Sequence, residues 1–307
     1  MMSRSKCDKN LYKSFLEATA IRYSGLALSE VSPKEISHDS ISRWLSNKNF
    51  RPSEIYKETR RQIREDVGGV LAIDDMPIEK PRSKKIELVK AQYSGSSHKV
   101  VPSMSIVNAV YIQEGNTIPI DFRVYAKEED GKTKNKHFTD MVKLSVKRGI
   151  KIECVVADSW YSSLKNLKVI RDMNLKWVMG LRKNRRVNKK QRLEDIKIEE
   201  NGTRVHLQGY GWVTVFRIDG KNGITKYFGT SIPDASFEDI KRYVKDRWAI
   251  EVYHKELKQT CGIAYCQARS GRAQRNRVCH KICYEKKRKK GKGIALQETS
   301  VEDATAL

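Results

Sequence analysis

One stretch near the C-terminal end of the chain, Tyr243 to Lys258, carries side chains whose types and spacing suit phosphate chemistry. On a helix, which turns about 100° per residue, an arc of roughly 80° contains a phenol, two cations and a carboxylate: Tyr243, Arg247, Glu251 and Lys258. The neighbouring arc is apolar, so one face of this helix is predicted to be buried. A carboxylate that holds a metal ion, flanked by cations that hold an anion, suits the handling of a phosphate. The alternative is a solvated helix on which Arg247, Glu251 and Lys255 form ion pairs.

Further carboxylates follow two short apolar runs. The run at 70–73 ends in Asp74 and Asp75, and the run at 152–157 ends in Asp158. Short apolar runs rich in β-branched residues are typical of buried strands. These acids are therefore expected at the ends of two strands in a sheet.

The order of the predicted elements brings the acids together. Strands at 98–111 and 117–125, joined by a hairpin turn at Gly115 and Asn116, follow the first strand. The later helices and strands are predicted at 136–148, 152–157, 161–173, 175–181 and 237–259. This order indicates an α/β fold with a ribonuclease-H-like mixed sheet flanked by helices, in which the first and fourth strands are neighbours. Asp75 and Asp158 would then emerge side by side, and the last helix would add Glu251.

Residues 182–233 do not fit that sheet and are predicted to form a β-rich insertion. The segments 204–217 and 226–232 resemble short strands joined by glycine turns. The insertion begins with a basic run that could bind a phosphate backbone. The alternative is that this run is an ordinary solvated loop. The candidates for gripping a DNA backbone are Arg182, Arg185 and Arg186.

Residues 1–67 are predicted to form a helical DNA-binding region that contains a possible helix-turn-helix. A short helix capped by Ser37 or Asp39 would present His38 and Arg43 on its polar face. An ordinary helical bundle is the alternative.

The catalytic domain is predicted to span 68–275, interrupted at 182–233. Residues 276–307 are predicted to be a basic, loosely ordered tail, because a cation block occupies 286–293 and sustained apolar periodicity is lost.

The composition points to nucleic acid as the partner. Lys and Arg number 61 against 37 Asp and Glu, which gives a formal charge of +24. No apolar run approaches the roughly 18 to 20 residues that span a bilayer, and the N-terminus lacks a signal-peptide pattern. We therefore expect an intracellular protein with no membrane partner. The six cysteines are expected to be reduced, as is usual in a cytosolic protein, and a zinc site is disfavoured because their spacings miss the usual pattern.

Three blocks of sequence give the chain a resemblance to insertion-sequence transposases of the DDE superfamily, in the group with a Tyr-Arg-Glu-Lys signature. Residues 73–81 resemble the block around the family's first catalytic acid. Residues 156–164 resemble the block around the second acid, and residues 247–258 resemble the block around the third. The second of two acids usually aligns with the catalytic one, so the resemblance favours Asp75 over Asp74. One departure is that three residues separate Tyr243 from Arg247, where the family has two.

The resemblance implies a mechanism and its components. Asp75, Asp158 and Glu251 would hold two Mg²⁺ ions, with Mn²⁺ able to substitute, for hydrolysis and transesterification at transposon ends. Tyr243, Arg247 and Lys258 would position phosphates. The partners would be double-stranded DNA, at transposon ends and at the target, and a second copy of the chain, with no small-molecule substrate. The protein would be prokaryotic, cytoplasmic and DNA-associated. Trp212 is the candidate for stacking on a flipped base.

Two other classes of protein compete with the transposase hypothesis. The family continues beyond residue 275 with an apolar helical segment where this chain has cations, which suggests a truncated or frame-shifted copy. Such a copy would act only as a DNA-binding protein. A ribonuclease-H-like resolvase or repair nuclease is disfavoured by the signature helix and the β-rich insertion.

Overall fold

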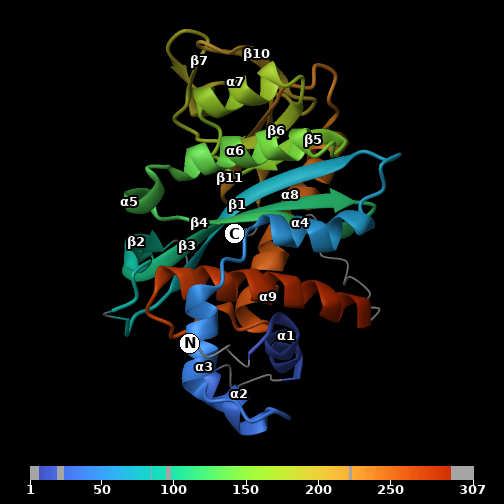
Figure 1. Cartoon of the computed structure of the whole chain (residues 1–307). Coiled ribbons are helices and arrows are strands. Elements are labelled where there is room, and N and C mark those ends of the chain that lie inside the picture. The colour runs from blue at the N-terminus through green and yellow to red at the C-terminus, as the bar shows by residue number, and fades with distance from the viewer. Residues whose placement is uncertain (1–6, 19–23, 84, 95–97, 221–222, 292–307) are drawn as a thin grey trace.

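The computed structural model describes residues 7–18, 24–83, 85–94, 98–220 and 223–291, with the backbone alone for 284–291 (Figure 1). A twisted sheet forms its centre. Helices α6 and α7 lie on one side of the sheet and α8 on the other, while α1, α2, α3 and α9 gather into a helical layer below it (Figure 1). The helices are α1 (Lys9–Ala18), α2 (Gly25–Val31), α3 (His38–Asn47), α4 (Ser53–Thr59), α5 (Lys127–Asp130), α6 (Lys134–Lys147), α7 (Leu164–Asp172), α8 (Phe237–Gln259) and α9 (Gly271–Gly291).

The main sheet has nine strands in the described part of the chain. In spatial order, eight of them are β2 (Lys90–Ser94), β3 (Lys99–Gln113), β1 (Gly69–Glu79), β5 (Ile152–Ala157), β6 (Lys176–Leu181), β11 (Thr225–Thr230), β10 (Gly211–Asp219) and β9 (Thr203–Leu207). The ninth, β4 (Asn116–Val124), pairs with β3. A separate small ribbon is formed by β7 (Arg186–Val187) and β8 (Gln191–Arg192).

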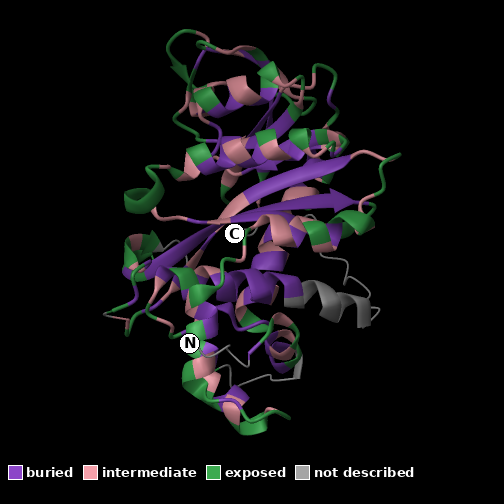
Figure 2. Ribbon diagram, viewed as in Figure 1, coloured by how far each residue is buried: buried purple, intermediate pink, exposed green. Residues whose placement is uncertain are grey.

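The pairing confirms the ribonuclease-H-like sheet. Strand β1 lies between β3, which is antiparallel to it, and β5, which is parallel to it. Strand β6 continues in parallel beyond β5. The apolar runs of β1 and β5 are buried on both faces, as expected for strands covered by helices on each side (Figure 2). The first and fourth strands of the predicted order are therefore neighbours.

The hairpin between β3 and β4 turns one residue earlier than predicted. Gln113 pairs with Asn116, which leaves Glu114 and Gly115 as the two turn residues. Both have positive φ, 50° and 75°, as in the primed turns that suit the right-handed twist of a hairpin. The prediction placed Asn116 in the turn, but this residue already belongs to β4.

The insertion is β-rich, yet the expectation that it stands apart from the sheet is wrong. Its hairpin of β10 and β11 returns antiparallel to β6, with Leu181 paired to Tyr227, so that the central sheet continues through β11, β10 and β9. The reason is that β6 would otherwise be an open edge, and β11 satisfies its outer backbone groups. The insertion is thus joined by strand pairing to the sheet that carries the acids.

Residues 276–283 are not a loosely ordered tail. They belong to α9, and the apolar side chains of Val278, Cys279, Ile282 and Cys283 are buried. These side chains pack against the sheet and the N-terminal helices. One of those helices, α3, is capped by Ser37, as predicted. The chain therefore continues beyond residue 275 with a helix that buries apolar side chains, although its overall composition is polar. The side chains of the cation block at 286–293 lie outside the described residues, as do residues 292–307.

None of the described helices is long and apolar enough to cross a membrane. All six cysteines are buried free thiols.

The buried Lys281 of α9 predicts a pH dependence of stability. Burial, and then the nearby Arg277, lower the pKa of Lys281 to about 7, whereas the unfolded chain keeps an ordinary lysine pKa of about 10.4. Between these values the unfolded state binds more protons, so this residue makes stability rise with pH. We expect wild type to gain about 2 kcal/mol relative to Lys281→Met between pH 7 and pH 9, measured by urea unfolding. A constant difference between the two proteins would contradict this.

Candidate active site

The two acids of β1 point to opposite faces of the sheet, because successive strand residues alternate. Val70, Ala72 and Met76 pack in the core beneath α8, whereas Leu71 and Ile73 pack in the core beneath α6 and α7. Asp74 accordingly belongs to the face covered by α8, and Asp75 belongs to the opposite face.

Asp75 is held by three groups of its own. Lys134 Nζ lies 2.6 Å from its Oδ2 atom, the Tyr161 hydroxyl donates to Oδ1 at 3.0 Å, and Ser105 Oγ donates to Oδ2 at 3.2 Å. Burial and then the negative charge of Asp75 raise the pKa of Tyr161 well above its usual value, so the phenol stays protonated and donates. The Asp75 carboxylate is therefore anchored in the structure.

Asp158 follows β5 directly and lies level with Asp74. The parallel register pairs Ala72 with Val156, so two residues further on Asp74 and Asp158 stand beside each other. The Asp158 Oδ1 atom accepts a hydrogen bond from the backbone N–H of Trp160 at 2.9 Å, which fixes the turn after the strand. The predicted meeting of strand-end acids is thus realised: Asp74 stands beside Asp158, and Asp75 lines a common cavity with both.

Helix α8 brings Glu251 to the same place. Asp74, Asp158 and Glu251 all line a cavity of about 580 Å³, and they also line a second cavity of about 390 Å³ beside it. Glu251 forms an ion pair with Arg247 at 2.7 Å, so the i,i+4 pairing considered as the alternative also occurs.

Cations line both cavities beside the three acids. The larger cavity is also lined by Lys134, Lys255 and Lys258, and the smaller one by Lys183, Lys226 and Arg247. Burial lowers the pKa of both Lys258 and Lys226. Anionic oxygens entering either cavity would therefore replace water around several cations.

The buried histidine of the site is neutral. Burial and then Lys258 lower the pKa of His254 to about 3. Its Nε2 atom is 3.0 Å from the Asn108 amide nitrogen, and its Nδ1 atom is 4.0 Å from Asp74 Oδ2. His254 therefore separates Asp74 from the core without neutralising its charge.

The donor set fits a divalent cation, although no three His, Cys, Asp or Glu side chains in the described ranges are already gathered as a metal cluster. Burial, and then repulsion from Asp158 and Asp75, raise the pKa of Asp74 well above its usual value. Burial and Asp75 also raise the pKa of Asp158. A cation between these carboxylates would remove that repulsion, and carboxylate oxygens are the ligands that Mg²⁺ prefers.

The structure does not bring all of the predicted phosphate-binding residues to the acids. Arg247 and Lys258 line the cavities, but Tyr243 is only 6% exposed and packs in the core. Arg182 and Arg185 line a third cavity of about 390 Å³ that also contains Ser159. The remaining candidates lie elsewhere: Arg186 on β7, and His38 and Arg43 on the exposed side of α3.

Trp212 is exposed, but it lies far from the acids. Leu181 beside the acids pairs with Tyr227, which pairs with Arg217 on β10. Trp212 precedes Arg217 by five residues, or about 17 Å along the strand. An exposed tryptophan that the prediction did not use, Trp160, follows Asp158 by two residues and carries the Arg182 guanidinium 5.6 Å from its ring centre.

The fold and the site together define a ribonuclease-H-like protein with clustered strand-end acids in a cationic cleft. Residues 66–284, more than half of the chain, match the family described as Transposase DDE domain, and the chain therefore belongs to this family. The predicted membership in the DDE transposases of insertion sequences is confirmed. The finer assignment to the Tyr-Arg-Glu-Lys group stays a prediction.

Similar proteins agree with the family. A probable transposase for insertion sequence element IS701 from Microchaete diplosiphon is 29% identical over 123 residues, which are 38% of this chain and 32% of that protein. The chain thus matches about a third of the length of this curated relative. The piggyBac transposase in a synaptic complex with hairpin DNA has a similar fold, with a TM-score of 0.55 at 15% identity over 99% of this chain and 71% of that one.

Proposed function

We propose that this chain is a DNA transposase that cuts phosphodiester bonds at the ends of an insertion element and joins the 3′-hydroxyls to target DNA. The observation that carries the proposal is the juxtaposition of Asp74 and Asp158 on neighbouring parallel strands, with Glu251 of α8 facing the same cavities. Membership in the DDE transposase family and the excess of positive charge support DNA as the substrate.

Asp74, Asp158 and Glu251 are the residues that would hold divalent metal ions, Mg²⁺ or Mn²⁺. Bound there, the ions would activate water and stabilise the charge on the oxygens of an in-line displacement. Asp74 takes the role assigned from sequence to Asp75, because it shares the α8 face with Glu251. Asp75 instead positions Lys134 and Tyr161.

The cations of the site bind and orient the DNA strand. Arg247 and Lys258 come from the helix that carries Glu251, so they would hold phosphate oxygens on either side of it. We assign base stacking to Trp160 in place of Trp212. Trp160 is 53% exposed, lies beside Asp158, and with Arg182 offers a cationic aromatic surface to a base.

A cleavage assay tests the proposal. The purified chain is incubated with Mg²⁺ and duplex DNA that spans the boundary of the genomic element carrying its gene. We expect a strand break at the boundary that leaves a 3′-hydroxyl, detected by extension with a template-independent polymerase. Asp158→Ala is expected to bind the same DNA without cutting it. Binding by wild type without any cleavage would instead identify a DNA-binding protein that does not cut.

DNA binding is also expected to weaken steeply with salt. Each phosphate neutralised by Lys or Arg releases counterions, so the logarithm of the association constant should fall by about 0.9 per contact for each tenfold rise in salt. Fluorescence anisotropy between about 50 and 200 mM KCl measures this slope. An affinity that does not change over this range would contradict DNA as the substrate.

A further inference from the structure

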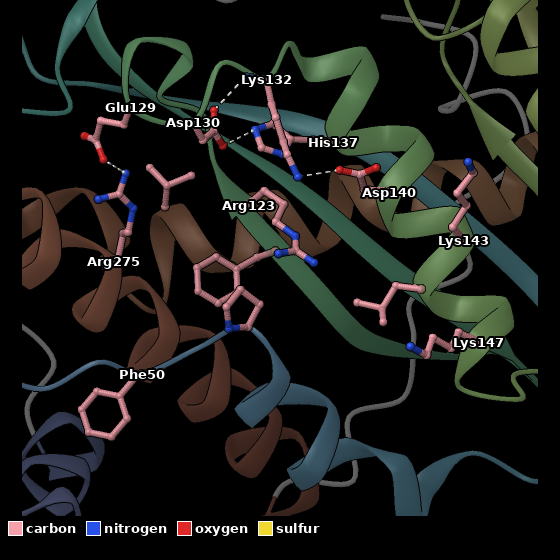
Figure 3. A pocket seen from close by; sticks show the side chains of 14 residues that line it. Phe50, Arg123, Glu129, Asp130, Lys132, His137, Asp140, Lys143, Lys147 and Arg275 are labelled. Carbon is pink, nitrogen blue, oxygen red and sulfur yellow. Dashed lines mark hydrogen bonds and ion pairs between the residues drawn. The ribbon is translucent and has the colours of Figure 1, made fainter.

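A cleft separate from the acids lies where the catalytic domain meets the N-terminal helices. Its volume is about 630 Å³, and it shares no lining residue with the two cavities of the acids. Its walls come from α6, β4, the segment 129–132, the segment 50–52 before α4, and Arg275 of α9 (Figure 3). A molecule bound in this cleft would touch both parts of the protein.

The floor of the cleft is apolar and firmly packed. Phe122 and Val124 of β4 belong to the buried core, and Phe50 lies edge-on to the ring of His280 at a centroid distance of 4.4 Å. Arg123 is held from behind by the buried Asp121 at 2.7 Å. These contacts keep the floor and its central guanidinium in place before any ligand arrives.

The cleft is lined by five cations and three carboxylates, and two of the cations are uncompensated. Glu129 is paired with Arg275 at 2.6 Å and Asp140 with Lys132 at 2.8 Å, while Asp130 lies 3.4 Å from His137. Within the part of the chain that the structure describes, neither Lys143 nor Lys147 forms an ion pair. Both are exposed, one helical turn apart on α6, and both line the cleft (Figure 3). The cleft thus has positive charge available for an anionic partner.

The position of these lysines relative to the acids indicates which anion they meet. Helix α6 begins at Lys134, which lines the larger cavity of the acids, and Lys147 follows about 20 Å further along the helix axis. At about 3.4 Å per base pair, this distance corresponds to roughly six base pairs of duplex. A duplex that runs along α6 and places one phosphate at the acids therefore has further phosphates within reach of the cleft.

We propose that this cleft binds the phosphate backbone of the DNA duplex beside the reacting phosphate, with Lys143 and Lys147 as its main contacts. The proposal rests on the proposed transposase function and adds a second DNA-binding surface to it. Arg123 and Arg275, already fixed by Asp121 and Glu129, contribute oriented donors. Bound DNA would tie the N-terminal helices to the catalytic domain.

The first test removes the two charges. The double variant Lys143→Gln/Lys147→Gln is compared with wild type by anisotropy on the boundary duplex over a range of KCl concentrations. Two lost phosphate contacts should reduce the slope of log K against log salt by about 1.8. The matched control is Lys176→Gln/Lys245→Gln, which removes two exposed lysines of β6 and α8 that line none of the cavities described above and should leave the slope unchanged. Equal melting temperatures exclude misfolding.

The second test locates the DNA. Because all six native cysteines are buried, Lys147→Cys can be labelled selectively with an iron–EDTA reagent. Strand breaks should centre about six base pairs from the cleavage position, and labelled Lys176→Cys should give none there.

The outcomes separate this proposal from the one on which it rests. Salt-sensitive binding by wild type, with an unchanged slope in the double variant and no cuts from position 147, would overturn the cleft as a DNA site and leave the transposase function intact. That result is expected if the cleft serves an acidic protein. Absence of DNA binding by wild type would overturn both proposals.

Discussion

Asp74→Asn is expected to reduce Mg²⁺-dependent strand cleavage about a thousandfold, whereas Asp75→Asn should reduce it only about 10- to 100-fold. The first loss corresponds to about 4 kcal/mol of transition-state stabilisation, as for removal of a principal electrostatic group. The second is typical of a residue that positions its neighbours without touching the reacting atoms. Steady-state cleavage of the boundary duplex measures both.

The difference follows from the faces of β1. Asp74 shares its face with Glu251, and Asp158 lies level with it. Asp75 is occupied by Lys134, Tyr161 and Ser105, and an asparagine in its place can still accept from one of the two hydroxyl groups through its single amide oxygen. Binding of DNA without metal should be nearly the same in both variants, with exposed Asp66→Asn as the control. Greater loss from Asp75→Asn than from Asp74→Asn would return the metal-binding role to Asp75.

Where the sequence carries clear local boundaries, the prediction matches the structure. The helix predicted at 237–259 and the strand predicted at 152–157 have the observed bounds. Helix α8 begins after the capping box of Ser236 and Asp239, and the apolar run of β5 ends in an acid. The order of these elements was enough to place Asp158 and Glu251 near the end of β1.

Other features depend on tertiary contacts that local patterns do not encode. Strand β2 is short, polar and at the sheet edge, so its sequence has no apolar alternation to detect. The choice between Asp74 and Asp75 depends on which face α8 covers, and both residues follow the same apolar run. In the same way, α9 buries Asn276, His280 and Lys281, so its polar composition hides a helix that lies inside the protein.

Asn276→Leu is expected to lower the free energy of unfolding by about 3 to 5 kcal/mol and to loosen the N-terminal helices. The amide nitrogen of Asn276 donates to the carbonyls of Leu45 and Lys48, both at 2.6 Å, and its oxygen accepts from the Phe50 N–H at 3.0 Å. These are backbone groups at the C-terminal end of α3 that no helical partner satisfies. Leucine fills a similar volume but leaves all three without their partner, and each buried loss costs about 1 to 3 kcal/mol.

Urea unfolding of the full chain measures this effect, and limited trypsin digestion shows where it acts. Cleavage at Lys48 should become faster in Asn276→Leu, because this residue follows the helix end that Asn276 holds. The matched control is Asn47→Leu, which changes an exposed asparagine at the end of the same helix. Equal stability of the two variants would mean that water molecules take over the three hydrogen bonds of Asn276. A specific loss would show that α9 fastens the N-terminal helices to the catalytic domain, which is the junction where the cleft of Lys143 and Lys147 lies.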